Sequence, residues 1–207
     1  MKGIGIPLLI ALYVACELIA NISAGRPVEI WGIQAPGGVF IYALTFTLID
    51  LINERLGKTR ARHVVLGAFA ANLLLALYST LVLSLPAPPY FTRQDAFAAV
   101  LGATPRIITA SLLAYLVSTW IDVEIFAAWK ARIGGSAWVR VLTSNTVSTG
   151  IDSVLFVTIA FGGTLPLLPL ITGQYLIKMA VTLVSLPLIS AVRFLGLSGA
   201  SADASPL

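Results

Sequence analysis

Residues 140–156, RVLTSNTVSTGIDSVLF, decide what kind of fold this chain can adopt. The stretch is apolar enough to lie in a bilayer, yet polar side chains recur in it at helical spacing. One face of such a helix carries Asn145, Ser148 or Thr149, Asp152 and Phe156. At about 1.5 Å of rise per residue, Asp152 lies about 18 Å beyond Arg140, near the middle of a hydrocarbon core about 30 Å thick. A carboxylate at that depth costs about 2.5–3.5 kcal/mol and normally faces protein, water or a ligand, which makes Asp152 the leading candidate for a functional residue.

The composition of the whole chain is that of a membrane protein. Of its 207 residues, 58% are hydrophobic and 11% are charged, whereas soluble domains have about 45–50% and about 25%. The apolar runs are long and unbroken, which indicates helices and not the alternating pattern of a membrane barrel. The single cysteine, Cys16, excludes an internal disulfide. Basic residues gather in membrane loops, so we expect no nucleic-acid partner despite the net charge of +4.

Six apolar spans follow one another, each long enough for a membrane helix. They lie near residues 4–23, 38–56, 64–85, 106–128, 139–161 and 168–194. Basic side chains gather after the second and fourth spans and at the end of the sixth: Arg55, Lys58, Arg60 and Arg62; Lys130, Arg132 and Arg140; and Arg193. The positive-inside rule places these segments in the cytoplasm. The sequence therefore predicts an all-α integral membrane protein, a six-helix bundle over residues 1–197 with cytoplasmic termini and a flexible tail at 198–207.

Two connections on the predicted outer side carry signals of local structure. Residues 24–38 hold an alternating VEIWGI core bounded by Gly and Pro, which predicts a short extended or hairpin segment over the outer mouth. Residues 86–105 begin with a proline-rich turn and then predict a short helix from about Thr92 to Leu101.

A short internal repeat brings acids to several helices. The sequence Ser-Thr-x-Ile-Asp occurs at residues 118–122 and again at 148–152, and Thr-Leu-Ile-Asp occurs at 47–50. The fourth and fifth spans run in opposite directions, so the repeat does not prove a duplication. It does place three aspartates on three helices of one small bundle: Asp50, Asp122 and Asp152.

Further polar residues form stripes on the first and last spans. The first span carries Tyr13, Glu17 and Asn21, and the last carries Gln174, Lys178, Thr182 and Ser185. A lone lysine at mid-depth must pair, lose its proton or reach the interface, and Asp152 is its candidate partner. The alternative for the pair, and for Glu17, Gln174 and Asn145, is a structural role that only joins helices. Asp50 and Asp122 lie nearer the cytoplasmic face, where they either serve a site or balance the basic loops.

No motif supports enzyme or cofactor chemistry. The chain has no P-loop, no glycine-rich dinucleotide fingerprint and no C-x-x-C. The sole histidine, His63, cannot build a metal cluster or a Ser-His-Asp arrangement. Paired membrane aspartates could form an aspartyl protease, but its G-x-G-D context is missing around Asp122 and Asp152. We therefore expect neither an enzyme nor a cofactor or metal.

Several separated motifs together resemble one family. Residues 50–57 read as D-x-x-N-E-x-x-G, and residues 174–178 read as Q-Y-x-x-K before a Leu-Pro. Between them, a run from Arg106 to Ala127 is followed by a basic connection, Trp138, Arg140 and TSNTVSTGIDSVLFVTIAF. This pattern, from about Asn21 to Phe194, resembles the queuosine precursor transporters of the vitamin uptake transporter group. Ala43 stands where that family often has proline, so we expect a less kinked second helix.

The resemblance implies import of a 7-deazaguanine base: queuine or its 7-cyano or 7-aminomethyl precursors. A carboxylate can accept the N1–H and amino group of a guanine-like edge, and an amide or lysine can donate to its O6. Asp152, Asn145, Asp50 and Asp122 are the candidate acceptors, Gln174 and Lys178 the donors, and Trp120, Phe46 or Tyr115 could stack on the ring. Glu17 completes the set of candidate substrate-binding residues.

The favoured mechanism is alternating access by a secondary carrier of the bacterial inner membrane, because no nucleotide-binding motif is present. The alternatives are a binding subunit like the S-components of ATP-driven vitamin importers and a non-transporting membrane scaffold. The expected partners are the small base and the lipid bilayer, with a homodimer as a candidate assembly.

Overall fold

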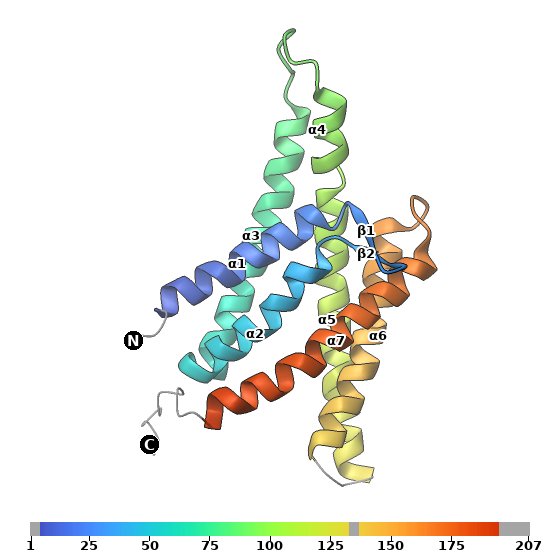
Figure 1. Ribbon diagram of the computed structural model, residues 1–207. Helices are drawn as coiled ribbons and strands as arrows, with labels where there is room; N and C mark the ends of the chain where they lie inside the picture. Colours follow the sequence, from blue (N-terminus) through green and yellow to red (C-terminus); the bar gives the residue numbers. More distant parts are fainter. Residues whose placement is uncertain (1–4, 133–136, 195–207) are drawn as a thin grey trace.

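The computed structural model describes residues 5–132 and 137–194, and this part of the chain forms seven helices and one two-stranded hairpin (Figure 1). The helices in chain order are α1 (Ile6–Ser23), α2 (Val39–Leu56), α3 (Lys58–Ser84), α4 (Gln94–Leu101), α5 (Thr104–Arg132), α6 (Ala137–Phe161) and α7 (Leu167–Phe194). The strands β1 (Pro27–Ile30) and β2 (Ile33–Pro36) lie between α1 and α2. The predicted tail at 198–207 lies outside the described residues.

All six predicted spans lie in long helices, which confirms a helical membrane protein. Four helical stretches among the described residues are long and apolar enough to cross a bilayer: Ile6–Ser23, Thr59–Ser84, Gln94–Ile121 and Leu167–Val184. Shorter apolar stretches lie in α2, at Val39–Asn53, and in α6, at Thr146–Phe161. The count of six crossings stays a prediction. The short helix expected near residues 92–101 is present as α4.

The third span begins earlier than predicted. We expected a basic loop before residue 64, but α3 starts at Lys58, and only Gly57, at φ 80°, separates it from the end of α2. Lysine and arginine are good helix formers, so the basic segment continues the helix beyond its apolar part. Hydropathy marks where a helix would leave the membrane, and the helix itself extends further.

The hairpin predicted in the first outer connection is confirmed. Ile30 pairs with Ile33 in antiparallel register, which leaves Trp31 and Gly32 as a two-residue turn. Both have positive φ, 52° and 79°, the backbone of a type I′ turn whose twist matches the flanking strands. The Trp31 side chain at the tip is 97% exposed, as suits an aromatic residue at a membrane–water interface.

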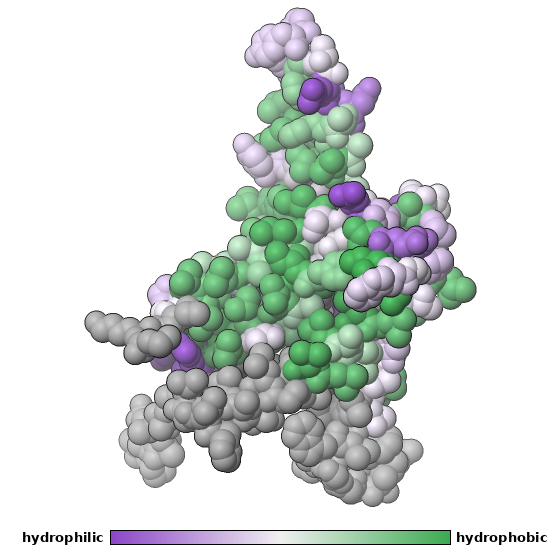
Figure 2. Space-filling model, in the orientation of Figure 1, coloured by the Kyte–Doolittle hydropathy of each residue, from purple (hydrophilic) through white to green (hydrophobic). Residues whose placement is uncertain are grey.

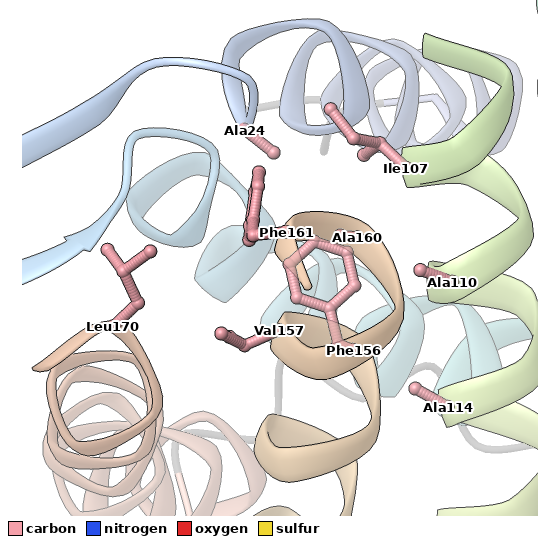
Figure 3. Packing of buried hydrophobic residues seen from close by; sticks show 9 residues of the cluster. All are labelled: Ala24, Ile107, Ala110, Ala114, Phe156, Val157, Ala160, Phe161 and Leu170. Carbon is pink, nitrogen blue, oxygen red and sulfur yellow. The ribbon is translucent and has the colours of Figure 1, made fainter. Parts of the chain in front are cut away.

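Small residues let the helices around α6 pack closely. Figure 3 shows Phe156, Val157 and Phe161 of α6 between α5 and α7, where they form one cluster with the other labelled residues. On α5 this cluster contains Ala110 and Ala114, both 1% exposed or less. Lipid chains are as apolar as the helix surfaces, so no hydrophobic driving force brings helices together within a bilayer. Helices associate there through such close packing instead.

The outer surface of the bundle is apolar where lipid would contact it. On α3 the side chains of Leu73, Leu74, Leu77 and Leu81 are each more than half exposed. Figure 2 shows hydrophobic side chains over the middle of one face and hydrophilic ones near the hairpin and near the α3–α4 end. In Figure 1 the start of α1, the α2–α3 connection and the end of α7 lie to the left, and the hairpin and the α6–α7 turn lie to the right.

Candidate functional site

An ion pair joins α6 and α7 inside the bundle. Lys178 Nζ donates to Asp152 Oδ2, and the two side chains are 8% and 14% exposed. This confirms the pairing that the sequence predicted. Because each charge is nearly removed from water, either one alone would be costly, and the pair fixes α7 against α6.

Two further helices contribute to the surroundings of this pair. The Lys178 ammonium lies 4.8 Å from the ring centroid of Tyr42, on α2, which is cation–π distance. From α5, Ser118 Oγ lies 3.5 Å from Asp152 Oδ1. Four helices therefore meet at one polar centre in an apolar bundle.

Two cavities meet at the ion pair. The hairpin-side cavity reaches toward the hairpin and the end of α1. Its lining comprises Ala20, Asn21, Ala24, Pro36, Gly38, Val39, Tyr42, Ser111, Asp152, Phe156, Gln174 and Lys178. The distal cavity lies further from the hairpin along α2, α5 and α6. Its lining comprises Tyr42, Phe46, Tyr115, Ser118, Thr119, Ser148, Thr149, Asp152 and Lys178.

Asp152, Lys178 and Tyr42 line both cavities. A molecule that entered from either side would therefore reach the same carboxylate, ammonium and aromatic ring.

A third cavity, the Glu17 cavity, adjoins the other two across Tyr42. It is lined by Tyr13, Glu17, Tyr42, Thr45, Phe46, Ile49, Val65, Phe69, Ser111, Leu112 and Tyr115. Glu17 is 8% exposed. Its carboxyl group is hydrogen-bonded with the side chains of Tyr13 and Thr45 and interacts electrostatically with Lys178.

The sequence repeat comes together at the distal cavity. Ser118 and Thr119 line it from α5, and Ser148 and Thr149 line it from α6. The repeated Ser-Thr dipeptides thus supply hydroxyl groups to one space from two neighbouring helices. Asp152 joins them there, whereas the side chain of its counterpart Asp122 lies outside the described residues.

The structure brings several of the predicted site residues together. Gln174, 2% exposed, lines the hairpin-side cavity one helical turn from Lys178. Phe46 lines the distal and Glu17 cavities, with its ring edge-on to Tyr42 at 5.4 Å between centroids. Tyr115 lines the same two cavities.

One predicted residue lies away from these cavities. Trp120 is 66% exposed on α5. It lies two positions beyond Ser118, which turns it to the other side of the helix. The backbones of Asp50, Asp122 and Asn145 lie in α2, α5 and α6, but their side chains lie outside the described residues, so their roles stay predictions.

Sequence reasoning missed Tyr42, although it lines all three cavities. A signal was present, because Tyr42, Phe46 and Asp50 recur at i, i+4 and i+8 on one helix face. It also missed Asn72, whose Oδ1 accepts a hydrogen bond from Asn21 Nδ2 at 2.7 Å and ties α3 to α1. Within residues 5–132 and 137–194, no group of three or more His, Cys, Asp and Glu side chains is placed to hold a metal ion.

A buried ion pair between two cavities, inside an apolar helical bundle, is a candidate site for a small polar molecule. The comparisons with known proteins define the class further. Residues 36–192 match the family described as "Putative vitamin uptake transporter", and the chain belongs to this family. It is a multi-pass protein of the bacterial inner membrane.

One relative makes the similarity more specific. Over 198 residues the chain is 32% identical to a protein of Bacillus subtilis (strain 168) named "Probable queuosine precursor transporter". The alignment covers 93% of this chain and 86% of that relative. The resemblance to queuosine precursor transporters is thereby confirmed. No solved structure matches the chain.

Proposed function

We propose that the protein is a secondary transporter that imports queuosine precursors across the inner membrane by alternating access. Its substrates in this proposal are 7-deazaguanine bases: queuine and its 7-cyano and 7-aminomethyl precursors. The name of the Bacillus subtilis relative supports the substrate class. The single observation that carries the mechanism is the Asp152–Lys178 pair, which lines both the hairpin-side and the distal cavity.

The pair is suited to exchange partners with a guanine-like edge. The carboxylate of Asp152 accepts the base's N1–H and 2-amino group, and Lys178 donates to O6. Removing one partner of a buried pair costs about 3–5 kcal/mol. The base offsets this cost because it gives each separated charge a new hydrogen-bond partner. The rings of Tyr42 and Phe46 are nearly perpendicular, so one of them stacks on the flat base while the other meets it edge-on, and Gln174 supplies an amide from the hairpin side.

Transport then requires only that the two cavities open in turn. The base enters through one cavity, binds at the pair, and leaves through the other when the helices move around it. Consumption of the base by later cytoplasmic reactions supplies a sink. The proposal includes six membrane crossings, by α1, α2, α3, α5, α6 and α7, with both termini in the cytoplasm. The basic residues Arg55, Arg60 and Arg62 at the α2–α3 connection support this orientation.

Uptake by the purified chain alone tests the proposal. Proteoliposomes that contain this chain and no ATP should accumulate radiolabelled 7-aminomethyl-7-deazaguanine faster than protein-free liposomes. The Asp152→Asn variant is the control for transport through the described site. Binding of the base without uptake would indicate a subunit like an S-component, which needs an ATP-driven partner. Neither binding nor uptake would indicate a membrane scaffold.

A further inference from the structure

The three cavities contain an imbalance of charge. Among the described residues that line them, Asp152 and Glu17 are the acidic side chains, and Lys178 is the one basic side chain. Lys178 already forms an ion pair with Asp152. Glu17 interacts electrostatically with Lys178 and is hydrogen-bonded with the neutral side chains of Tyr13 and Thr45, but no described basic side chain lines its own cavity. A carboxyl buried in this way requires a proton or a positively charged partner.

The walls of the Glu17 cavity favour a positively charged partner. Five aromatic side chains line it: Tyr13, Tyr42, Phe46, Phe69 and Tyr115. Two edge-to-face contacts organise four of these rings, Tyr42 with Phe46 at 5.4 Å and Phe69 with Tyr115 at 5.1 Å between centroids. Aromatic faces attract organic ammonium groups, and a carboxylate among several rings is the chemistry that recognises them. The aromatic lining is an observation separate from the excess of acidic over basic side chains, and both indicate a positively charged ligand.

The position of the cavity connects it to the proposed base site. Tyr42 and Phe46 line both the distal cavity and the Glu17 cavity, and Tyr42 also contacts Lys178. A base held at Asp152 by its N1–H and 2-amino group carries the substituent on C7 on the adjacent edge, beside the O6 to which Lys178 donates. That substituent is an alkylammonium in the 7-aminomethyl base, since aliphatic amines titrate near pH 10, and a neutral nitrile in the 7-cyano base.

We propose that the Glu17 cavity is the subsite for the positively charged amine on C7, and that Glu17 is the residue that selects aminomethyl-type bases over the cyano base. The inference rests on the function proposed above. An ammonium group gives Glu17 the cation that the cavity lining lacks. A nitrile has no hydrogen to donate and brings its electron-rich nitrogen toward a carboxylate, so the cyano base leaves Glu17 uncompensated.

Calorimetric binding of two bases to the full chain in detergent, at neutral pH, tests this subsite. The probes are 7-aminomethyl- and 7-cyano-7-deazaguanine, which share the same pyrimidine edge. Wild type should bind the aminomethyl base at least about tenfold more tightly. Glu17→Gln keeps the shape and removes the charge, so it should weaken aminomethyl binding by about tenfold to a hundredfold, whereas cyano binding should not weaken and should tighten to the extent that the carboxylate disfavours the nitrile. Glu17→Asp keeps the charge and should retain the preference in part.

Asp152→Asn is the matched control, because it alters the edge that both bases share and should weaken both by a similar factor. Equal losses for the two bases in Glu17→Gln would overturn the proposal, as would equal affinities in wild type, a comparison that needs no variant. A Glu17→Gln variant that keeps the preference but loses a pH dependence of uptake would show that Glu17 carries a proton instead. If wild type binds neither base, the proposed function fails; if it binds both without preference, only the subsite fails.

Discussion

Lys178 on α7 and Asp152 on α6 form their ion pair at the place where the hairpin-side and distal cavities meet. The pair can act in two ways, which are separable by experiment. It can stabilise the resting bundle by holding two helices together, and it can exchange its internal contact for a bound base. The first two predictions address these roles in turn.

The stability role predicts non-additive mutational effects. Lys178→Met or Asp152→Asn alone leaves one buried group without its partner, which for a charged group costs about 3–5 kcal/mol. Removing both leaves no such group, so the double variant should lose less stability than the two single losses combined. Denaturant unfolding in detergent of all four proteins gives the coupling free energy. Strictly additive losses would contradict an energetic coupling between the two side chains.

The recognition role predicts a loss of affinity on Asp152→Asn. The amide keeps the shape but replaces one acceptor oxygen with a donor, so one N–H of the base is left unpaired. Loss of a charge-assisted hydrogen bond costs about 1.5–3 kcal/mol, and the unpaired group adds to it, so binding should weaken by about tenfold to several-hundredfold. Calorimetry on a variant shown to be folded measures this effect.

An analogue that lacks the 2-amino group provides the ligand control. It should bind poorly to wild type already and should lose less on Asp152→Asn than the natural base does. A variant that binds the natural base as tightly as wild type would assign Asp152 a structural role and would place the site elsewhere.

How much of the site was predictable depended on how unusual each residue is in an apolar chain. A lysine and an aspartate at similar depth have few other partners, so the Lys178–Asp152 contact could be predicted from the sequence. Tyr42 was harder to predict: its spacing with Phe46 and Asp50 was a signal, but an aromatic residue in an apolar span is most often simple packing. Its central place depends on how α2 lies against α7, which no local pattern encodes. The same long-range packing decides which way Trp120 faces, so it was a reasonable candidate for stacking from the sequence although its side chain is largely exposed.

The fold shows the same division between local and long-range information. The hairpin could be predicted because Gly, Pro and alternation act within a few residues. The predicted start of the third span did not match the start of α3, because hydropathy reports the membrane boundary. Lys58 belongs to a helix that continues beyond this boundary. The Asn21–Asn72 hydrogen bond joins residues 51 positions apart, and nothing in either segment alone indicates the other.

Strand β2 of the hairpin packs against α7 at Gly173, and this contact predicts that a larger residue at this position destabilises the protein. A Cβ added at Gly173 would lie 1.8 Å from the backbone oxygen of Gln34, so α7 or β2 would have to move. Gly173→Ala should therefore destabilise the protein by about 1–3 kcal/mol, the usual cost of overpacking. Gly67→Ala is the matched control, because a Cβ at this exposed position on α3 meets nothing within 4 Å. It should be neutral or stabilising, since alanine is the better helix former. Unfolding of both variants in detergent tests this, and equal effects would contradict close packing of the hairpin on α7.

The orientation of the chain predicts where introduced cysteines react. The buried Cys16 is first replaced by alanine, so that each variant carries a single thiol. A cysteine at Lys58, at the start of α3 beside the basic residues, should react with a membrane-impermeant maleimide only after the membranes are opened. A cysteine at Trp31, the 97% exposed tip of the hairpin, should react from outside in intact spheroplasts and serves as the positive control. Labelling of both positions from outside would place the α2–α3 connection and the hairpin on the same side of the membrane. That result would contradict a crossing by α2 between them, and with it the proposed six-span topology.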